Sequence, residues 1–236
     1  MLEAQSSFGY QLGVSLRSED LFLVLDKDVI FDFNANPFWW PEFSTFWVVI
    51  GAVLTQNTKW ENVEKSFVNL KNAGVQSLED VANLSEPSLA NLIKPSGFYN
   101  TKAKRLSMLC KNILDKFGSF EEFMKNVSRK WLISQKGLGF ESVDSILCYA
   151  CSRDIMVVDK YTLRIFEFLD FTFESYDEAR QWLEDIDRNA VYKVVGSISD
   201  NELFARYHGL IVEFCKTHFK AGNFDEKAKK ALKNLL

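Results

Sequence analysis

The chain has 236 residues, of which 47% are hydrophobic and 25% charged, and its formal net charge is −4. This composition excludes a wholly disordered chain, and the length suffices to bury a core without disulfides or metals. No apolar run approaches the roughly 20 residues that a membrane-spanning helix needs, and residues 1–10 lack the basic and apolar stretches of a signal peptide. The sequence therefore predicts a cytosolic or nuclear protein without a membrane partner.

The first predicted elements are a short hairpin and a buried helix. Residues 21–25 and 29–33 are rich in β-branched and aromatic side chains and flank a polar triplet, which suggests two short strands. Residues 46–54 (FWVVIGAVL) are apolar all round, so this segment is interpreted as a central helix with the core built around it.

Aromatic side chains flank this central helix. Trp39, Trp40 and Pro41 precede it, and Trp60 follows it. Tryptophan is more often a core residue than a ligand-binding one, so the residues alone leave both interpretations open.

Along the chain, apolar residues recur mostly at helical spacing, for example at 81–93. Four serines have an acidic residue three positions later, the pattern of a capping box at a helix start: Ser77, Ser119, Ser175 and Ser199. No repeat or flexible linker is visible. We therefore expect a mostly helical protein whose lobes, if there are two, pack closely.

Charge is segregated along the chain despite the acidic total. Residues 94–111 include Lys102, Lys104 and Arg105 and no acidic side chain, whereas 167–187 is mainly acidic. Two solvated helix faces would explain this pattern, and a local phosphate-binding face is the alternative.

Four cysteines, at positions 110, 148, 151 and 215, are predicted to be free thiols because a chain without a signal peptide meets a reducing pool. Cys148 and Cys151 form a C-x-x-C without a second pair, which favours two core thiols over a metal site. We expect no metal and no cofactor.

The segment 131–150 contains a glycine turn between two predicted helices. The first is expected to end at Lys136, Gly137-Leu138-Gly139 to form the turn, and the second to begin near Phe140. Two glycines allow positive φ angles and close approach of another molecule, and N–H groups at a helix start can bind phosphate. As a bare pattern, an ordinary helix-to-helix turn explains it equally well.

Asp159 follows an apolar run, and Arg164 stands five residues later. An aspartate before a helical run is commonly an N-cap. The order and spacing of Gly137, Gly139, Asp159 and Arg164, however, resemble the signature of the helix-hairpin-helix DNA glycosylases, the endonuclease III relatives. The stretch LTQNT with Gln56 is similar to the family segment that carries a helix-probing glutamine. The resemblance covers roughly residues 38–220 and implies an all-α fold with two helical lobes and a DNA-binding cleft.

The chain also departs from this family. Bifunctional members have a lysine two residues after the second hairpin glycine, where this chain has Glu141. A carboxylate cannot form the imine of a β-lyase step, so the resemblance implies a monofunctional enzyme. Many relatives hold an iron–sulfur cluster with four C-terminal cysteines, whereas only Cys215 stands there, so we expect no cluster.

Three further stretches resemble the 3-methyladenine DNA glycosylases of this superfamily: 39–41, 52–60 and 94–105. The closing segment 206–216, which contains His208 and Lys216, is similar as well. Some relatives have a lysine directly after the His-Gly pair, where this chain has Leu210.

The resemblance implies a role for each matched residue. Asp159 would stabilise the oxocarbenium-like sugar and orient or deprotonate the attacking water. Trp39 and Trp60 would stack on a flipped cationic base, which gains roughly 0.5–2 kcal/mol over an indole face. The remaining pocket residues would be Trp40, Pro41 and Lys216. His208 is interpreted either as a core residue or as a residue that supports the site without touching the substrate, and it is given no catalytic role.

DNA would be held by the hairpin and by the basic stretch. Gln56 would fill the gap left by the flipped base. Backbone N–H groups of the turn would bind phosphates, helped by neighbouring cations. The predicted DNA-binding residues are Gln56, Lys136, Gly137, Leu138, Gly139, Phe140, Lys102, Lys104 and Arg105.

The resulting prediction has one lobe at 45–155, with the helix-hairpin-helix at 129–150, and a second at 1–44 plus 156–236. We expect a monomer that excises alkylated purines, chiefly 3-methyladenine, from double-stranded DNA and needs a downstream abasic-site endonuclease. By resemblance it would be a bacterial cytoplasmic protein associated with the nucleoid. The alternatives are a glycosylase for uracil or a mismatched or oxidised pyrimidine, a non-catalytic DNA-binding module, and a helical interaction protein.

Overall fold

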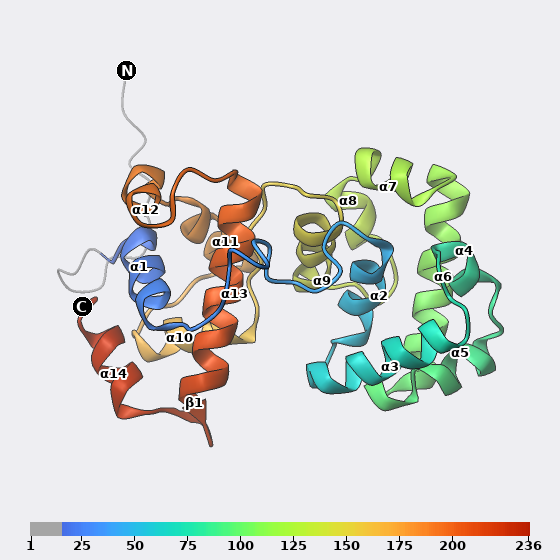
Figure 1. Ribbon diagram of the computed structural model, residues 1–236, viewed down its shortest axis with the longest axis horizontal. Coiled ribbons are helices and arrows are strands. Elements are labelled where there is room, and N and C mark those ends of the chain that lie inside the picture. Colours follow the sequence, from blue (N-terminus) through green and yellow to red (C-terminus); the bar gives the residue numbers. More distant parts are fainter. Residues whose placement is uncertain (1–15) are drawn as a thin grey trace. The chain divides into compact units, whose positions relative to one another are not determined.

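A computed structural model describes residues 16–236 of the chain. Residues 1–15, which include the segment inspected for a signal peptide, lie outside the described residues. Helices form most of the described part, which confirms the all-α prediction (Figure 1). None of these helices is long and apolar enough to cross a membrane. The chain divides into two compact units, Trp40–Arg153 and Met1–Trp39 with Asp154–Leu236.

The unit Trp40–Arg153 contains the predicted central helix, α2 (Phe46–Leu54), whose residues 47–54 are all buried. The hydroxyl of Thr45 caps it by accepting a hydrogen bond from the N–H of Trp47. The other elements of this unit are α3 (Trp60–Asn72), α4 (Leu78–Asn83), α5 (Glu86–Leu92), the 3-10 turn η1 (Lys94–Ser96), α6 (Tyr99–Phe117), α7 (Phe120–Asn126), α8 (Arg129–Ile133), α9 (Phe140–Ser145) and the π-helical turn η2 (Ile146–Ala150), of which α6, α9 and η2 pack against α2.

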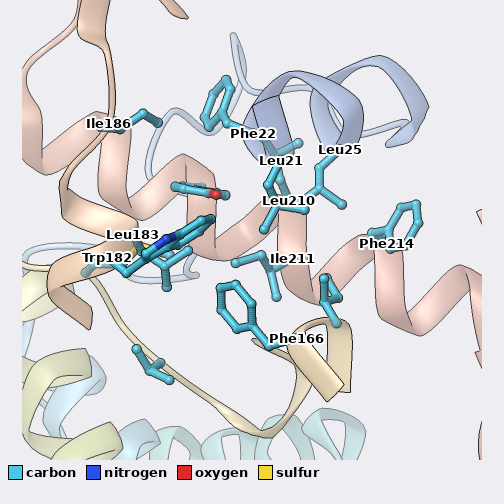
Figure 2. Packing of buried hydrophobic residues seen from close by; sticks show 14 of the residues in the cluster. Leu21, Phe22, Leu25, Phe166, Trp182, Leu183, Ile186, Leu210, Ile211 and Phe214 are labelled. Atoms are coloured by element: carbon cyan, nitrogen blue, oxygen red, sulfur yellow. The ribbon is translucent and has the colours of Figure 1, made fainter. Parts of the chain in front are cut away.

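The other unit is built on α13 (Asp200–His218), most of whose side chains are buried. Figure 2 shows its core, in which apolar side chains of α1, α10, α11 and α13 gather in one cluster. Fully burying such side chains stabilises a fold by roughly 1.5–3 kcal/mol each. The remaining elements are α1 (Ser18–Asp28), α10 (Lys160–Phe168), α11 (Tyr176–Glu184), α12 (Arg188–Val195), β1 (Phe219–Lys220), β2 (Asn223–Phe224) and α14 (Glu226–Lys233).

The predicted N-terminal hairpin is wrong, because α1 occupies most of that segment. Leu21, Phe22 and Leu25 recur at helical spacing and are fully buried, and acidic residues stand in the first turn, where the helix dipole favours them. Burial of this stripe outweighs the β-branched and aromatic composition. The one hairpin in the described residues lies instead near the C-terminus, where β1 pairs with β2 in antiparallel register.

The four predicted serine caps are confirmed. Each serine hydroxyl accepts a hydrogen bond from the N–H three residues later. In two of them the acidic side chain accepts from the N–H of the residue before the cap, Gln76 or Glu174, and the Asp80 carboxylate also accepts from the Ser77 hydroxyl. The four cysteines are buried free thiols, and burial raises the pKa of Cys110 and Cys151 to about 12.

Candidate active site

Asp159 is the N-cap of α10, at the end of a buried extended segment. Its Oδ1 accepts hydrogen bonds from the Thr162 N–H at 2.8 Å and from the Thr162 hydroxyl at 3.0 Å. The Asp159 N–H donates back to that hydroxyl at 3.3 Å, which completes a capping box. Only 7% of Asp159 is exposed. Its carboxylate is therefore held in one orientation and shielded from bulk water.

The second carboxylate oxygen of Asp159 faces His208 on α13. The distance from Oδ2 to Nε2 of His208 is 3.8 Å, and His208 is 4% exposed. Burial alone raises the pKa of Asp159, but His208 and the hydrogen bonds from Thr162 outweigh it and hold the pKa below its ordinary value. The carboxylate is thus ionised at neutral pH. Such a fixed charge stabilises a cation that develops beside it.

Trp39 packs against the same helix. Its ring meets His208 edge to face with centroids 5.3 Å apart, and its indole N–H donates to Oε1 of Glu213 at 3.1 Å. A Cβ atom at Gly209 would lie 2.5 Å from Cγ of Trp39, so only glycine leaves room for the indole. Nζ of Lys216 lies 5.5 Å from the indole centroid. The structure therefore brings two predicted pocket residues, Trp39 and Lys216, together, and it places Trp39 beside His208.

The backbone around the aromatic run is unusual. Trp39, Glu42 and Ser44 have φ angles of 61°, 61° and 60°. The left-handed region is costly for residues other than glycine, roughly 1–3 kcal/mol each, and persists only where neighbouring contacts impose it. One such contact joins the Ser44 N–H to the carbonyl of Tyr149, at 2.8 Å, within η2. Single π turns often occur at functional sites.

In the unit Trp40–Arg153, Trp40 and Trp60 meet edge to face with ring centroids 5.6 Å apart. Trp40 also packs against Tyr149, with centroids 4.9 Å apart, and is only 6% exposed. The prediction that Trp40 closes the base pocket therefore needs correcting, because its ring supports Trp60 from within the core. Trp60 is half-buried and its indole N–H donates to Glu64 at 3.0 Å, while Pro41 is exposed.

The glycine turn joins α8 to α9. The second helix begins at Phe140, as predicted, but α8 ends at Ile133, before the predicted Lys136. Arg129 on α8 holds the two helices together through two hydrogen bonds, of 2.7 and 3.0 Å, to the buried carboxylate of Asp144.

The two glycines of the turn differ. Gly137 has a φ of 92°, and a Cβ atom there would overlap the side chain of Arg105. Gly139 is the N-cap of α9 with a φ of −95°, and a Cβ atom there would meet nothing within 4 Å. Gly137 is thus required by the fold, whereas Gly139 leaves an open approach to the helix N-terminus.

Several predicted phosphate contacts lie around this turn. Lys136, Gly139 and Phe140 are exposed, and Arg105 packs against Gly137. The first-turn N–H groups of α9 have no partner within the helix. Leu138 needs correcting as a donor, because its N–H already donates to the Gln135 carbonyl at 3.2 Å.

Gln56 lies just after α2, and its amide donates to the Gly137 carbonyl and to the Ser142 hydroxyl, both at 3.0 Å. These bonds tie the end of α2 to the hairpin. Filling a gap in a duplex would break both of them, so that role stays a prediction.

Lys102 does not lie on a DNA-binding surface, so its prediction as a phosphate contact is wrong. It is 3% exposed, and its Nζ donates to the Leu54 carbonyl at 2.8 Å and to the Ser96 carbonyl at 2.7 Å. Burial lowers the pKa of this ammonium to about 8. Lys102 joins the ends of α2 and η1, while Lys104 on the same helix is exposed.

Sequence reasoning missed Thr162, Glu213 and Phe98, and it gave His208 no catalytic role. Thr162 had a usable signal, the capping-box spacing from Asp159. His208 and Glu213 stand in the segment 206–216 that resembles the family, but their contacts depend on how α13 packs. Phe98 is 73% exposed and has a φ of 48° at the N-cap of α6. A large apolar side chain exposed on a strained backbone indicates a functional surface.

Residues 50–187, which include the hairpin and Asp159, match the sequence model of the HhH-GPD superfamily of base excision DNA repair proteins. A Methanocaldococcus jannaschii protein with the provisional name of a DNA repair glycosylase is 40% identical over 195 residues, which cover 80% of this chain and 84% of that protein. Endonuclease III of Thermotoga maritima is 25% identical over 187 residues, which cover 77% and 78%.

Two solved structures are also similar. The crystal structure of the H. pylori 3-methyladenine DNA glycosylase MagIII, bound to 1,N6-ethenoadenine, matches with a TM-score of 0.79 and 43% identity over 86% of this chain and 98% of that chain. A non-covalent complex of endonuclease III with DNA matches with a TM-score of 0.67 over 94% and 95%, and its 19% identity shows a shared fold.

Proposed function

Because the chain belongs to the HhH-GPD superfamily of base excision DNA repair proteins, we propose that this DNA glycosylase removes alkylated purines, chiefly 3-methyladenine, from double-stranded DNA. The similarity to MagIII, a 3-methyladenine glycosylase whose structure holds an alkylated purine, supports this substrate class. An alkylated purine such as 3-methyladenine is cationic in DNA and therefore leaves readily, so the enzyme needs little acid catalysis.

The observation that carries the proposal is the buried, ionised carboxylate of Asp159. Loss of the base leaves positive charge on the sugar, and a carboxylate fixed by Thr162 and His208 needs no reorganisation to stabilise it. The same group can orient and deprotonate the attacking water, with the proton passing to the carboxylate as the new C–O bond forms.

We propose that two indoles, Trp39 and Trp60, receive the flipped base. Trp39 presents an indole next to His208, and Trp60 presents a half-buried ring supported by Trp40. Extrusion of a base costs a few kcal/mol, which stacking and gap filling offset. The exposed ring of Phe98 is a candidate for contact with the opened duplex, in addition to Gln56.

A lyase step is not part of the proposed reaction. Glu141 is exposed in the first turn of α9, and its carboxylate cannot form a Schiff base with the sugar. The product would be an intact strand with an abasic site, so a downstream endonuclease must cut it. We further propose a monomer that works in the bacterial cytoplasm at the nucleoid.

The test is the release of bases from methylated duplex DNA by the wild type, by Asp159→Asn and by Asp187→Asn. Asp187 caps α12 in the same unit, so its variant controls for the loss of an aspartate cap. Released bases are separated by chromatography, and strand breaks are scored before and after alkali.

We expect the wild type and Asp187→Asn to release 3-methyladenine, Asp159→Asn to lose at least about a hundredfold in rate, and breaks to appear only after alkali. No release by the wild type at any enzyme level would overturn the substrate assignment and require a panel of uracil, mismatched and oxidised lesions. Breaks before alkali would overturn the monofunctional assignment. Unchanged release by Asp159→Asn would remove Asp159 from the mechanism.

A further inference from the structure

Glu213 and Lys216 lie on α13 beside the indole of Trp39. Oε1 of Glu213 accepts the indole N–H at 3.1 Å and the Lys216 ammonium at 2.9 Å. That ammonium also lies over the indole ring, 5.5 Å from its centroid. Both side chains are partly exposed, Glu213 less so than Lys216. The Glu213 carboxylate therefore fixes the orientation of the Trp39 ring and also holds the Lys216 ammonium above it.

An indole face next to a carboxylate is a binding site for a cation. The ring quadrupole attracts positive charge at its face, and the carboxylate adds a full negative charge at the ring edge. In this structure the site holds the chain's own ammonium, carried on a flexible stem that can swing into solvent. Lys216 thus marks where a positive charge is stabilised against Trp39.

We propose that Glu213 and Lys216 make the Trp39 face selective for a positively charged base. This inference rests on the proposed function and deepens it. A cationic purine that stacks on Trp39 displaces the Lys216 ammonium and takes over its interaction with Glu213, so the charge balance of the site is kept.

A neutral base binds less favourably at the Trp39 face. When it displaces Lys216, the Glu213 carboxylate loses its cation and gains no replacement, although it still accepts the indole N–H. Leaving a partly buried charge without its partner is unfavourable. The pair therefore discriminates against undamaged purines, which are neutral and present in large excess, as well as favouring alkylated purines that carry a positive charge.

The two variants that test this are expected to act in opposite directions. Glu213→Gln keeps an acceptor for the Trp39 N–H but removes the charge, so the preference for a cationic over a neutral base should fall by about three- to tenfold. Lys216→Met removes the competing ammonium and leaves the carboxylate, so that preference should rise by a similar factor. Glu226→Gln and Lys229→Met, an ion pair of the same spacing on α14, serve as controls and should change nothing.

The readout is the ratio of single-turnover release from duplexes that contain either 7-methylguanine, which is cationic, or 1,N6-ethenoadenine, which is neutral. The affinity of each duplex is measured in the Asp159→Asn background, so that binding is compared even where one lesion is not released. A merely structural role would lower both substrates alike and leave the ratio unchanged, which would overturn the inference alone. Failure of the wild type to bind or release any alkylated purine would overturn the proposed function, and this inference with it.

Discussion

Gly137→Ala is the change whose cost can be worked out most directly from the hairpin. At a φ of 92° an alanine is strained by about 1–2 kcal/mol. Its Cβ would also overlap the side chain of Arg105, which must leave its position at a cost of about 0.5–1.5 kcal/mol. The sum is about 1.5–3.5 kcal/mol, which for a chain of this size lowers Tm by about 3–14 °C.

Gly139→Ala is the matched control for this prediction. Its φ of −95° suits any residue, and the space beside it is open. Alanine is a poorer N-cap than glycine, so we expect a loss of about 0.5–1 kcal/mol and a Tm change of about 1–4 °C. The methyl group added at position 139 would stand where a phosphate approaches the N-terminus of α9. The affinity for DNA should therefore fall without much loss of stability.

The assay combines calorimetric unfolding with fluorescence anisotropy on an undamaged duplex at fixed salt, because phosphate contacts depend strongly on ionic strength. Equal Tm losses in the two variants would refute the assignment of Gly137 to the fold. Wild-type DNA affinity in Gly139→Ala would refute the assignment of the hairpin N–H groups to phosphate binding.

Two further variants test the α13 face. His208→Leu removes a group that lowers the pKa of Asp159, whereas the burial that raises this pKa remains. Because the carboxylate acts when ionised, the acid limb of the kcat–pH profile should move to higher pH, with about tenfold loss of kcat for each pH unit below the new pKa. A uniform drop of kcat at all pH values would contradict this. Gly209→Ala gains about 1 kcal/mol of helix propensity but displaces the Trp39 ring from its position. We therefore expect a Tm near the wild-type value and a rate of base release reduced at least about tenfold. Unimpaired release would contradict the placement of Trp39.

Features with a local cause could be predicted from the sequence. The serine caps, the buried helix at 46–54 and the start of α9 at Phe140 follow from hydrogen bonds and burial within a few residues. The motif identified Asp159. Its N-cap role and its proposed catalytic role both depend on the fixed position of its carboxylate at the start of α10. At 21–25 the residue types favoured strands. Because all five residues are apolar, their spacing did not distinguish a strand from the helix that forms.

Features set by packing could not be predicted. Lys102 stands in a basic stretch, which favours a phosphate-binding surface. Its ammonium is nevertheless buried, because the ends of α2 and η1 present two carbonyls that need a hydrogen-bond donor. Trp40 and Trp60 look alike in sequence, but the first packs on Tyr149 and the second stays near the surface.

The same reasoning explains why His208 gained a role only in the structure. A histidine on an apolar helix is ordinarily a core residue, and nothing within a few positions of it marks a carboxylate partner. Its contact with Asp159 arises because α10 begins beside the middle of α13, where Gly209 also makes room for Trp39. A glycine in the interior of a helix costs about 1 kcal/mol. That cost is explained if this face of α13 lowers the pKa of Asp159 and also makes room for Trp39, the ring proposed to stack on the base.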